Sequence, residues 1–410
     1  MSDPIITRAS IQLPDDFKFG QLRPNHQAPA APAPAAPLGP LAAFVGTFAG
    51  NGFNTIFRPN NPNSPPLPIP FPNSDNVLEL NLTAETLSFS KSLGNVPNRG
   101  TVPQNDIELN GVPYVQQIND ITIHGESTPI HFEPGLWMDV PATQVPPFNQ
   151  PSVTRMASIP HGTTINAQGI FKLGNPGKPT IDPVDITPIV IATGQPVSPG
   201  TFPSQDANNQ NTPRIPQDLS PFITRGTITP AMLKDPNSLL NAHISKQNIV
   251  EFDVIFISTS PGKPPLPPPG NNLFGGGTAN IAFLLGAPQT TPPPNPNPQN
   301  ANAVLMTAVF WIETVEEEIE IGLPYHVGGP PILLRATPSI AGQRVALFSV
   351  EAPFDLKTGQ KITLPFTQIQ YTQTVILNFK GLSWPHVSVN TLVPADRIEI
   401  GPHSSVWGKK

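Results

Sequence analysis

The chain has 410 residues, of which 58 are proline, 31 are glycine and none is cysteine, and only 12% are charged. Interior proline breaks helices, so this composition excludes a protein of long helices, while 38% hydrophobic residues suffice for a core of strands. The net charge is −6, and the sequence has no Lys/Arg cluster, which argues against a nucleic-acid partner. The lack of cysteine excludes disulfides, zinc–thiolate sites, iron–sulfur clusters and thiolate-ligated haem.

The N-terminal residues, Met-Ser-Asp-Pro-Ile-Ile-Thr-Arg, do not contain the apolar core of a signal peptide. No uninterrupted apolar stretch reaches the length of a membrane-spanning helix. The sequence therefore predicts a soluble, cytoplasmic protein without a membrane partner.

Residues 1–40 are expected to form an N-terminal arm that ends in a spacer rich in Ala and Pro. Ordered structure is expected from Leu41, where residues 41–58 read as a strand that contains three glycines. Glycine inside a strand marks a bend or a close approach of two backbones. We expect one elaborated domain over 41–400 and a C-terminal tail over 401–410.

About ten to fourteen strands are expected, because short apolar runs alternate with polar residues and are separated by Pro-rich loops. The best helix candidate is 230–244, in which Asp235-Pro236-Asn237 either breaks the helix or begins a second one. Two long insertions are expected near 171–222 and 260–366. After the first strand, the expected strands are 77–90, 113–124, 129–139, 153–159, 163–169, 248–259, 278–285, 303–315, 332–337, 343–350, 368–379 and 386–393.

This pattern predicts an all-β protein with long Pro-rich loops and inserted strands. Mostly alternating strands suit either a closed antiparallel barrel or a large sandwich. A barrel has no free edge, and its interior can hold one small ligand.

Five segments stand out in chain order. They are Gly46-Thr-Phe48-Ala-Gly50-Asn-Gly52, Asn54-Thr55-Ile56, Ile130-His131-Phe-Glu133-Pro-Gly135-Leu-Trp137, Pro160-His161-Gly162 within 159–169, and Trp384-Pro385-His386-Val387. Together they resemble the nitrobindin-like family of haem-binding, calycin-like β-barrels. Phe stands where the family has Trp in the first segment, and Asn stands where it has Pro in the second. Family members are shorter, so 171–222 and most of 260–366 are additions.

The resemblance implies that His386 is the axial ligand of a haem b iron and that Thr55 lines the haem pocket. It also implies a ferric haem with an open or water-occupied sixth position, suited to NO, peroxynitrite or a peroxide. From the residues alone, His386 would be a histidine that caps a turn after Pro385, and Thr55 an ordinary strand residue.

His131, Glu133 and Trp137 lie at even spacing and share one face of a regular strand. They either gather at the pocket or form an exposed pair beside a packing Trp, and the sequence favours the exposed pair. A third metal ligand is not evident near them.

The remaining histidines give weaker signals. His161 is expected in a turn and His124 on the surface, while either His243 or His326 is a candidate for the distal side of the haem. Tyr371 and Trp384 pack either on a porphyrin or in the core; neither choice is decided by the sequence.

Three further functions stay open, and no catalytic residue is identified. One is a haem enzyme that acts on a larger organic hydroperoxide through a channel built by the insertions. Another is a haem-free binder of an apolar ligand inside the barrel. A structural protein is the third, because of the Pro-rich loops.

Overall fold

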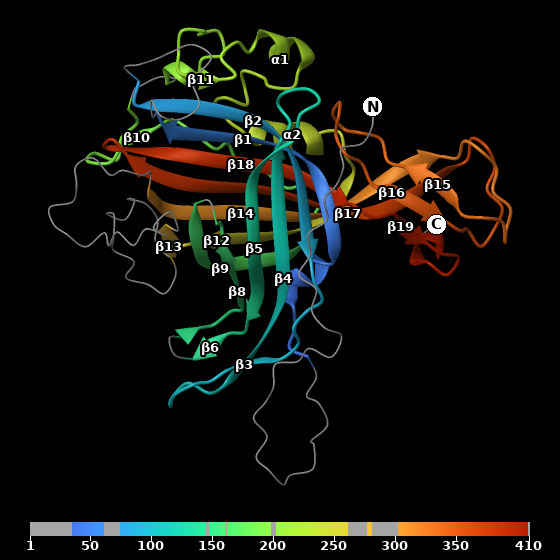
Figure 1. The fold of residues 1–410 in the computed structure, drawn as a ribbon. Coiled ribbons are helices and arrows are strands. Elements are labelled where there is room, and N and C mark those ends of the chain that lie inside the picture. The colour runs from blue at the N-terminus through green and yellow to red at the C-terminus, as the bar shows by residue number, and fades with distance from the viewer. Residues whose placement is uncertain are drawn as a thin grey trace.

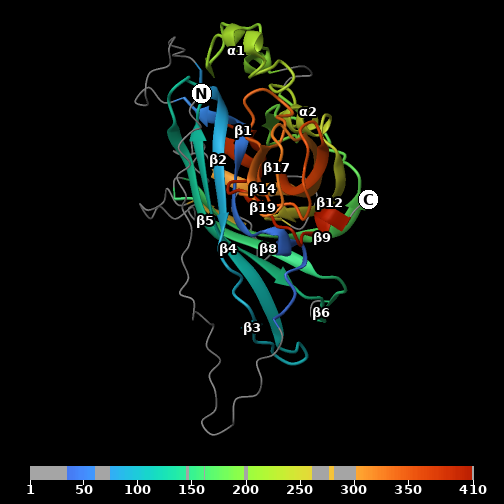
Figure 2. The same cartoon turned by 90° about the vertical axis from the view of Figure 1, so that its right-hand side faces the viewer.

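The computed structural model describes residues 35–60, 74–144, 147–160, 162–197, 202–260, 277–280 and 302–408. Its main body is a closed barrel of ten antiparallel strands (Figure 1 and Figure 2). The predicted all-β fold and the predicted barrel are both confirmed.

Around the barrel, the strands follow the order β2-β1-β18-β17-β14-β12-β9-β8-β5-β4, and pairing of β2 with β4 closes the ring. Closure satisfies the backbone groups that an open sheet leaves at its edges. The barrel strands are β1 (Gly46–Pro59), β2 (Asn76–Phe89), β4 (Ile107–Asp120), β5 (Thr128–Val140), β8 (Ser152–Ser158), β9 (Thr163–Pro176), β12 (Ile249–Ser258), β14 (Asn302–Glu320), β17 (Lys361–Phe379) and β18 (Leu382–Pro394).

Side chains from all ten strands form one buried cluster, which identifies the lumen. Because side chains alternate along a strand, its members fix which residues of each strand point inward. The 3₁₀ helix η1 (Gly39–Ala43) closes one end, where Phe44 stacks on Phe89 with ring centroids 4.5 Å apart. The sequence predicted a strand from Leu41, but Gly39 adopts a positive φ and Pro40 starts the helical turn instead. We call the opposite end, where β5 and β18 begin, the far end.

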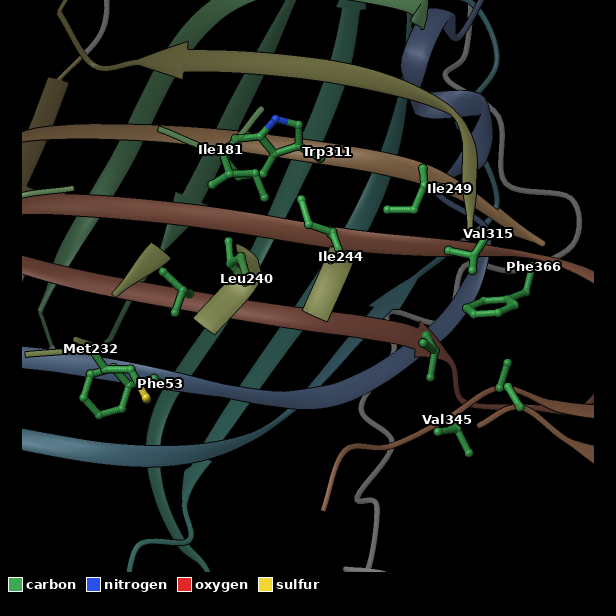
Figure 3. Close-up of a cluster of buried hydrophobic side chains, with 14 of the residues drawn as sticks. Phe53, Ile181, Met232, Leu240, Ile244, Ile249, Trp311, Val315, Val345 and Phe366 are labelled. Carbon is green, nitrogen blue, oxygen red and sulfur yellow. The ribbon is translucent and has the colours of Figure 1, made fainter. Parts of the chain in front are cut away.

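A second buried cluster lies outside the barrel wall and forms an outer layer. It joins outward side chains such as Phe53 of β1 and Trp311 of β14 to α2 (Asn237–Ile244) (Figure 3). The predicted helix thus begins after Pro236, and a short helix α1 (Ser220–Arg225) precedes it. No helix in the described ranges is long and apolar enough to span a membrane.

A small sheet packs beyond the barrel near the C-terminus (Figure 1). It consists of β15 (Ile332–Arg335), β16 (Leu347–Val350) and β19 (Ile398–Ile400), and η4 (Ser405–Gly408) follows it. The remaining short elements are β3 (Val96–Asn98), β6 (Thr143–Gln144), β7 (Pro147–Phe148), β10 (Ile189–Val190), β11 (Arg214–Ile215), β13 (Gly277–Asn280) and η2 (Pro203–Gln205).

The stretches expected as insertions contain barrel wall. β9 runs on to Pro176, inside 171–222, and β14 lies wholly inside 260–366. Both strands pair over long stretches with β12, so the barrel needs them to close. Residues 281–285, the end of one expected strand, lie outside the described residues.

Candidate functional site

His386 lies near the start of β18, at the far end of the barrel, and is partly buried. Its Nε2 is 2.8 Å from Nδ2 of Asn54, whose side chain points into the lumen from the neighbouring strand β1. The same amide nitrogen donates to Oγ of Ser388 at 2.7 Å. Because an amide nitrogen only donates, Nε2 of His386 accepts this hydrogen bond and carries its lone pair toward the lumen side of β1.

The wall on the other side of His386 is apolar. Val375 of β17 stands opposite His386, and Met306 of β14 stands opposite Val375. Both side chains belong to the luminal cluster. His386 therefore separates an apolar wall from a polar one.

Thr55 does not line the lumen. Its neighbours Phe53 and Phe57 on the same face of β1 both belong to the outer layer, as does its cross-strand partner Val387. Thr55 is fully buried there, and its hydroxyl oxygen has no hydrogen-bond partner. The residue that faces His386 is Asn54, because strand alternation places successive side chains on opposite sides of the wall.

The two aromatic candidates of the sequence are both core residues. Tyr371 points into the lumen and stacks on Phe310 with ring centroids 5.2 Å apart. Trp384 stacks on Phe379 at 4.8 Å and packs in the outer layer against Phe57.

Below His386 the lumen holds a buried carboxyl group, that of Glu85 on β2, which is 3% exposed. Three neutral groups donate to it: Tyr371 Oη at 2.5 Å, Asn390 Nδ2 at 2.7 Å and Gln116 Nε2 at 2.7 Å. Burial without a directly paired cation raises the pKa of Glu85 to about 7. Oδ1 of Asn390, also buried, has no hydrogen-bond partner.

A second luminal carboxyl group, that of Glu133 on β5, is fully buried and directly paired with a cation. Arg155 of β8 donates to it through Nη2 at 2.6 Å, and Tyr114 Oη also donates to it. Burial by itself raises the pKa of Glu133, but the charge of Arg155 and the hydrogen bonds from His131 and Tyr114 outweigh burial and lower it to about 2.

Arg155 ties the two carboxyl groups into one network. Its Nε donates to Tyr114 Oη at 2.7 Å and its Nη1 to Gln373 Oε1 at 2.7 Å. A long contact of 3.4 Å joins its Nη2 to Oε1 of Gln116, whose Nε2 donates to Glu85. The far half of the lumen therefore holds this polar network beside the apolar Val375 and Met306, while the half next to η1 is filled by aromatic and aliphatic side chains.

His131 is the member of this network nearest the far end. Its Nε2 lies 3.1 Å from Oε2 of Glu133, and its side chain is 15% exposed. Trp137, on the same face of β5, is buried against Phe44 and Phe310. The exposed pair that the sequence favoured is therefore wrong: closure of the barrel turns this face of β5 into the lumen.

The other histidines lie away from the lumen or outside the described residues. His243 is buried on α2 in the outer layer, where its Nδ1 lies 3.0 Å from Ser339 Oγ. His326 is exposed beside Asp355, and His124 is exposed as expected. His161 lies outside the described residues.

Sequence reasoning missed Asn54, Glu85 and Arg155. Arg155 and Glu85 did carry a signal, because each is a charged residue that shares one face of an alternating strand with an apolar residue two positions away, Val153 and Leu87 respectively. A charge at such a position is normally paired or hydrogen-bonded. In the described part of the chain, no group of three or more His, Asp or Glu residues is arranged to hold a metal ion.

No protein-family model, no curated protein and no solved structure matches this chain.

Proposed function

We propose that this protein binds haem b at the far end of its barrel, with His386 as the axial ligand of the iron. The proposal rests on one observation above all: a partly buried histidine points inward there and carries a lone pair on Nε2. An imidazole nitrogen that carries no proton is the form that coordinates iron, and here that nitrogen accepts a hydrogen bond from Asn54. The ordered resemblance to the nitrobindin-like family supports the same role.

The surroundings of His386 fit an amphipathic ring. Val375 and Met306 would contact its apolar surface, and Asn54, Ser388 and Asn81 supply polar groups on the other side. Nε2 is engaged by Asn54 in the haem-free chain, so coordination requires that this amide turn away. That exchange costs one hydrogen bond, about 1 kcal/mol net.

Bound haem would supply an iron with one free position, on which NO, peroxynitrite or a peroxide binds. The chain itself would orient the ring through His386 and limit the access of water through the packed lumen beneath it.

The test is a titration of the full-length, haem-free protein with hemin, followed by absorption in the Soret region. Wild type is expected to give a saturable Soret band, and His386→Ala to lose or shift it. His326→Ala is the matched control, because His326 is an exposed histidine of the small C-terminal sheet region, and it should behave as wild type. A colourless wild type, or a His386→Ala variant with wild-type spectrum and affinity, refutes the proposal.

A further inference from the structure

The small sheet near the C-terminus leaves one strand edge open. In its order β15-β16-β19, β15 lies at the end and pairs with β16 alone among the described strands. Figure 1 shows this sheet projecting from the side of the barrel. The N–H and C=O groups along an open edge are a template for pairing with another extended chain.

The hydrogen bonds of β15 show which of its main-chain groups face the open edge. The N–H group of Ala336 donates to the carbonyl of Ala346, and antiparallel alternation directs the groups of Leu334 toward β16 as well. The N–H and C=O groups of Leu333 and Arg335 therefore point away from β16. Within the described ranges, no hydrogen bond pairs these four groups.

The open edge is limited to these two residues. Pro331 has no N–H group to offer, and the N–H group of Thr337 donates to Oε1 of Glu317 at 3.0 Å. A contact along so short an edge lies well below the roughly 1,200 Å² that stable interfaces between folded proteins bury. The edge therefore suits a short extended segment rather than a second folded domain.

The exposed face of β15 combines an apolar side chain with a cation. Leu333 is 60% exposed, and Arg335, two residues further on, is exposed on the same face. No acidic side chain of the described residues forms an ion pair with Arg335. Exposed hydrophobic side chains also occur in the loops that precede β15 and follow β16: Leu323, Val327 and Phe354.

A second copy of the chain fits this edge poorly. Two β15 strands related by a two-fold axis run antiparallel, and three registers join an open residue of one copy to an open residue of the other. In these registers Arg335 lies opposite Leu333, Pro331 or Arg335 of the second copy. It then meets an apolar side chain, a residue without an N–H group or a like charge, so no register pairs its charge.

We propose that β15 binds a short extended segment of another protein, which adds to the small sheet as an antiparallel strand. The segment carries an acidic residue opposite Arg335 and an apolar residue opposite Leu333, so it reads acidic-x-apolar from its N-terminal side. Main-chain hydrogen bonds supply the affinity, and the two side-chain pairs supply the specificity. The inference goes beyond the proposed haem site and does not depend on it.

The test uses the haem-free full chain and two labelled peptides that differ in one charge. The first peptide is Ser-Thr-Glu-Thr-Val-Thr-Gly, the second has Lys in place of Glu, and binding is followed by fluorescence anisotropy. We expect wild type to bind the acidic peptide roughly five- to tenfold more tightly than the basic one. Arg335→Glu should reverse this order, and Lys234→Glu, which changes an exposed lysine between α1 and α2, should bind as wild type.

A second variant tests the main-chain contacts. Leu333→Pro removes one open N–H group, and proline is tolerated there because this group does not bond to β16. It should abolish binding of the acidic peptide. Should this variant fail to fold by circular dichroism, the reversal by Arg335→Glu still decides the question.

Hydrogen–deuterium exchange gives an independent readout on wild type. The amides of Leu333 and Arg335 should exchange rapidly in the free protein and become protected when the acidic peptide is added. The inference is overturned if no saturable binding occurs up to about 1 mM peptide, or if Arg335→Glu keeps the wild-type preference. Protection of β15 in the free protein that grows with protein concentration also overturns it, because a second copy then covers the edge.

Discussion

The stability of this protein should fall as the pH rises through neutrality, because Glu85 is buried without a directly paired cation. Its pKa is raised from 4.5 to about 7 by burial. Between these values the folded chain holds a proton that the unfolded chain has lost. The stabilisation is therefore fully present below pH 4.5 and is lost as the pH rises through about 7.

The magnitude follows from the two pKa values. The linkage between protonation and folding predicts that this one group lowers the free energy of unfolding by roughly 2.5 kcal/mol between about pH 5 and pH 8. Glu85→Gln is nearly isosteric and cannot ionise, so its free energy of unfolding should lack the pH dependence that Glu85 contributes. The difference between the two proteins isolates Glu85 from every other titrating group.

The assay is urea unfolding followed by tryptophan fluorescence, with wild type and Glu85→Gln at about four pH values from 5 to 8. We expect the stability of wild type relative to the variant to drop steadily over this range. Glu313→Gln, which removes a buried carboxyl group from the outer layer rather than the lumen, should leave the Glu85 component unchanged. If the free energy of unfolding changed with pH in the same way in wild type and Glu85→Gln, the reasoning about a buried luminal carboxyl group without a paired cation would be refuted.

Three further perturbations test the packing and charges of the barrel. Arg155→Met should cost about 3–5 kcal/mol in urea unfolding, because it leaves Glu133 buried without its cation. Gly135→Ala should cost about 1–3 kcal/mol by the same assay, because its Cβ would lie 2.5 Å from the ring of Tyr114. Glu313, whose burial raises its pKa from 4.5 to about 8, should make wild type lose stability relative to Glu313→Gln as the pH rises from about 5 through 8.

Matched controls are available for the first two substitutions. Arg99 pairs with Asp106 on the surface, so Arg99→Met should leave stability nearly unchanged. A Cβ on Gly322 would meet nothing within 4 Å, so Gly322→Ala should also be tolerated. A control as costly as its test variant would show that the loss does not come from the luminal contacts.

The sequence by itself determined the class of fold and most of its strands. Alternation over 77–90 and 129–139 predicts β2 and β5 to within a residue or two at each end, because successive side chains of a strand point to opposite faces. The glycines of β1 likewise marked a close approach: a Cβ on Gly50 would overlap the backbone carbonyl of Thr391. These features are local, so the sequence carries them directly.

Only the tertiary structure decided which face of each strand is the lumen. Phe53 and Phe57 cover the outside of β1 under the outer layer, so Asn54 rather than Thr55 meets His386. Alternation alone cannot tell these two faces apart, since both are buried in a barrel that carries a second layer.

The luminal network was likewise beyond the sequence. Glu85 on β2, Glu133 on β5 and Arg155 on β8 are up to 70 residues apart, and their pairing depends on the register and closure of the barrel. A charged residue in a buried strand indicates that an ion-pair or hydrogen-bond partner exists. Only closure of the barrel brings that partner within hydrogen-bonding distance. The physical reason is that the alternation of a strand depends on residues adjacent in the chain. The pairing of charged side chains in the lumen depends instead on residues that face each other across the barrel.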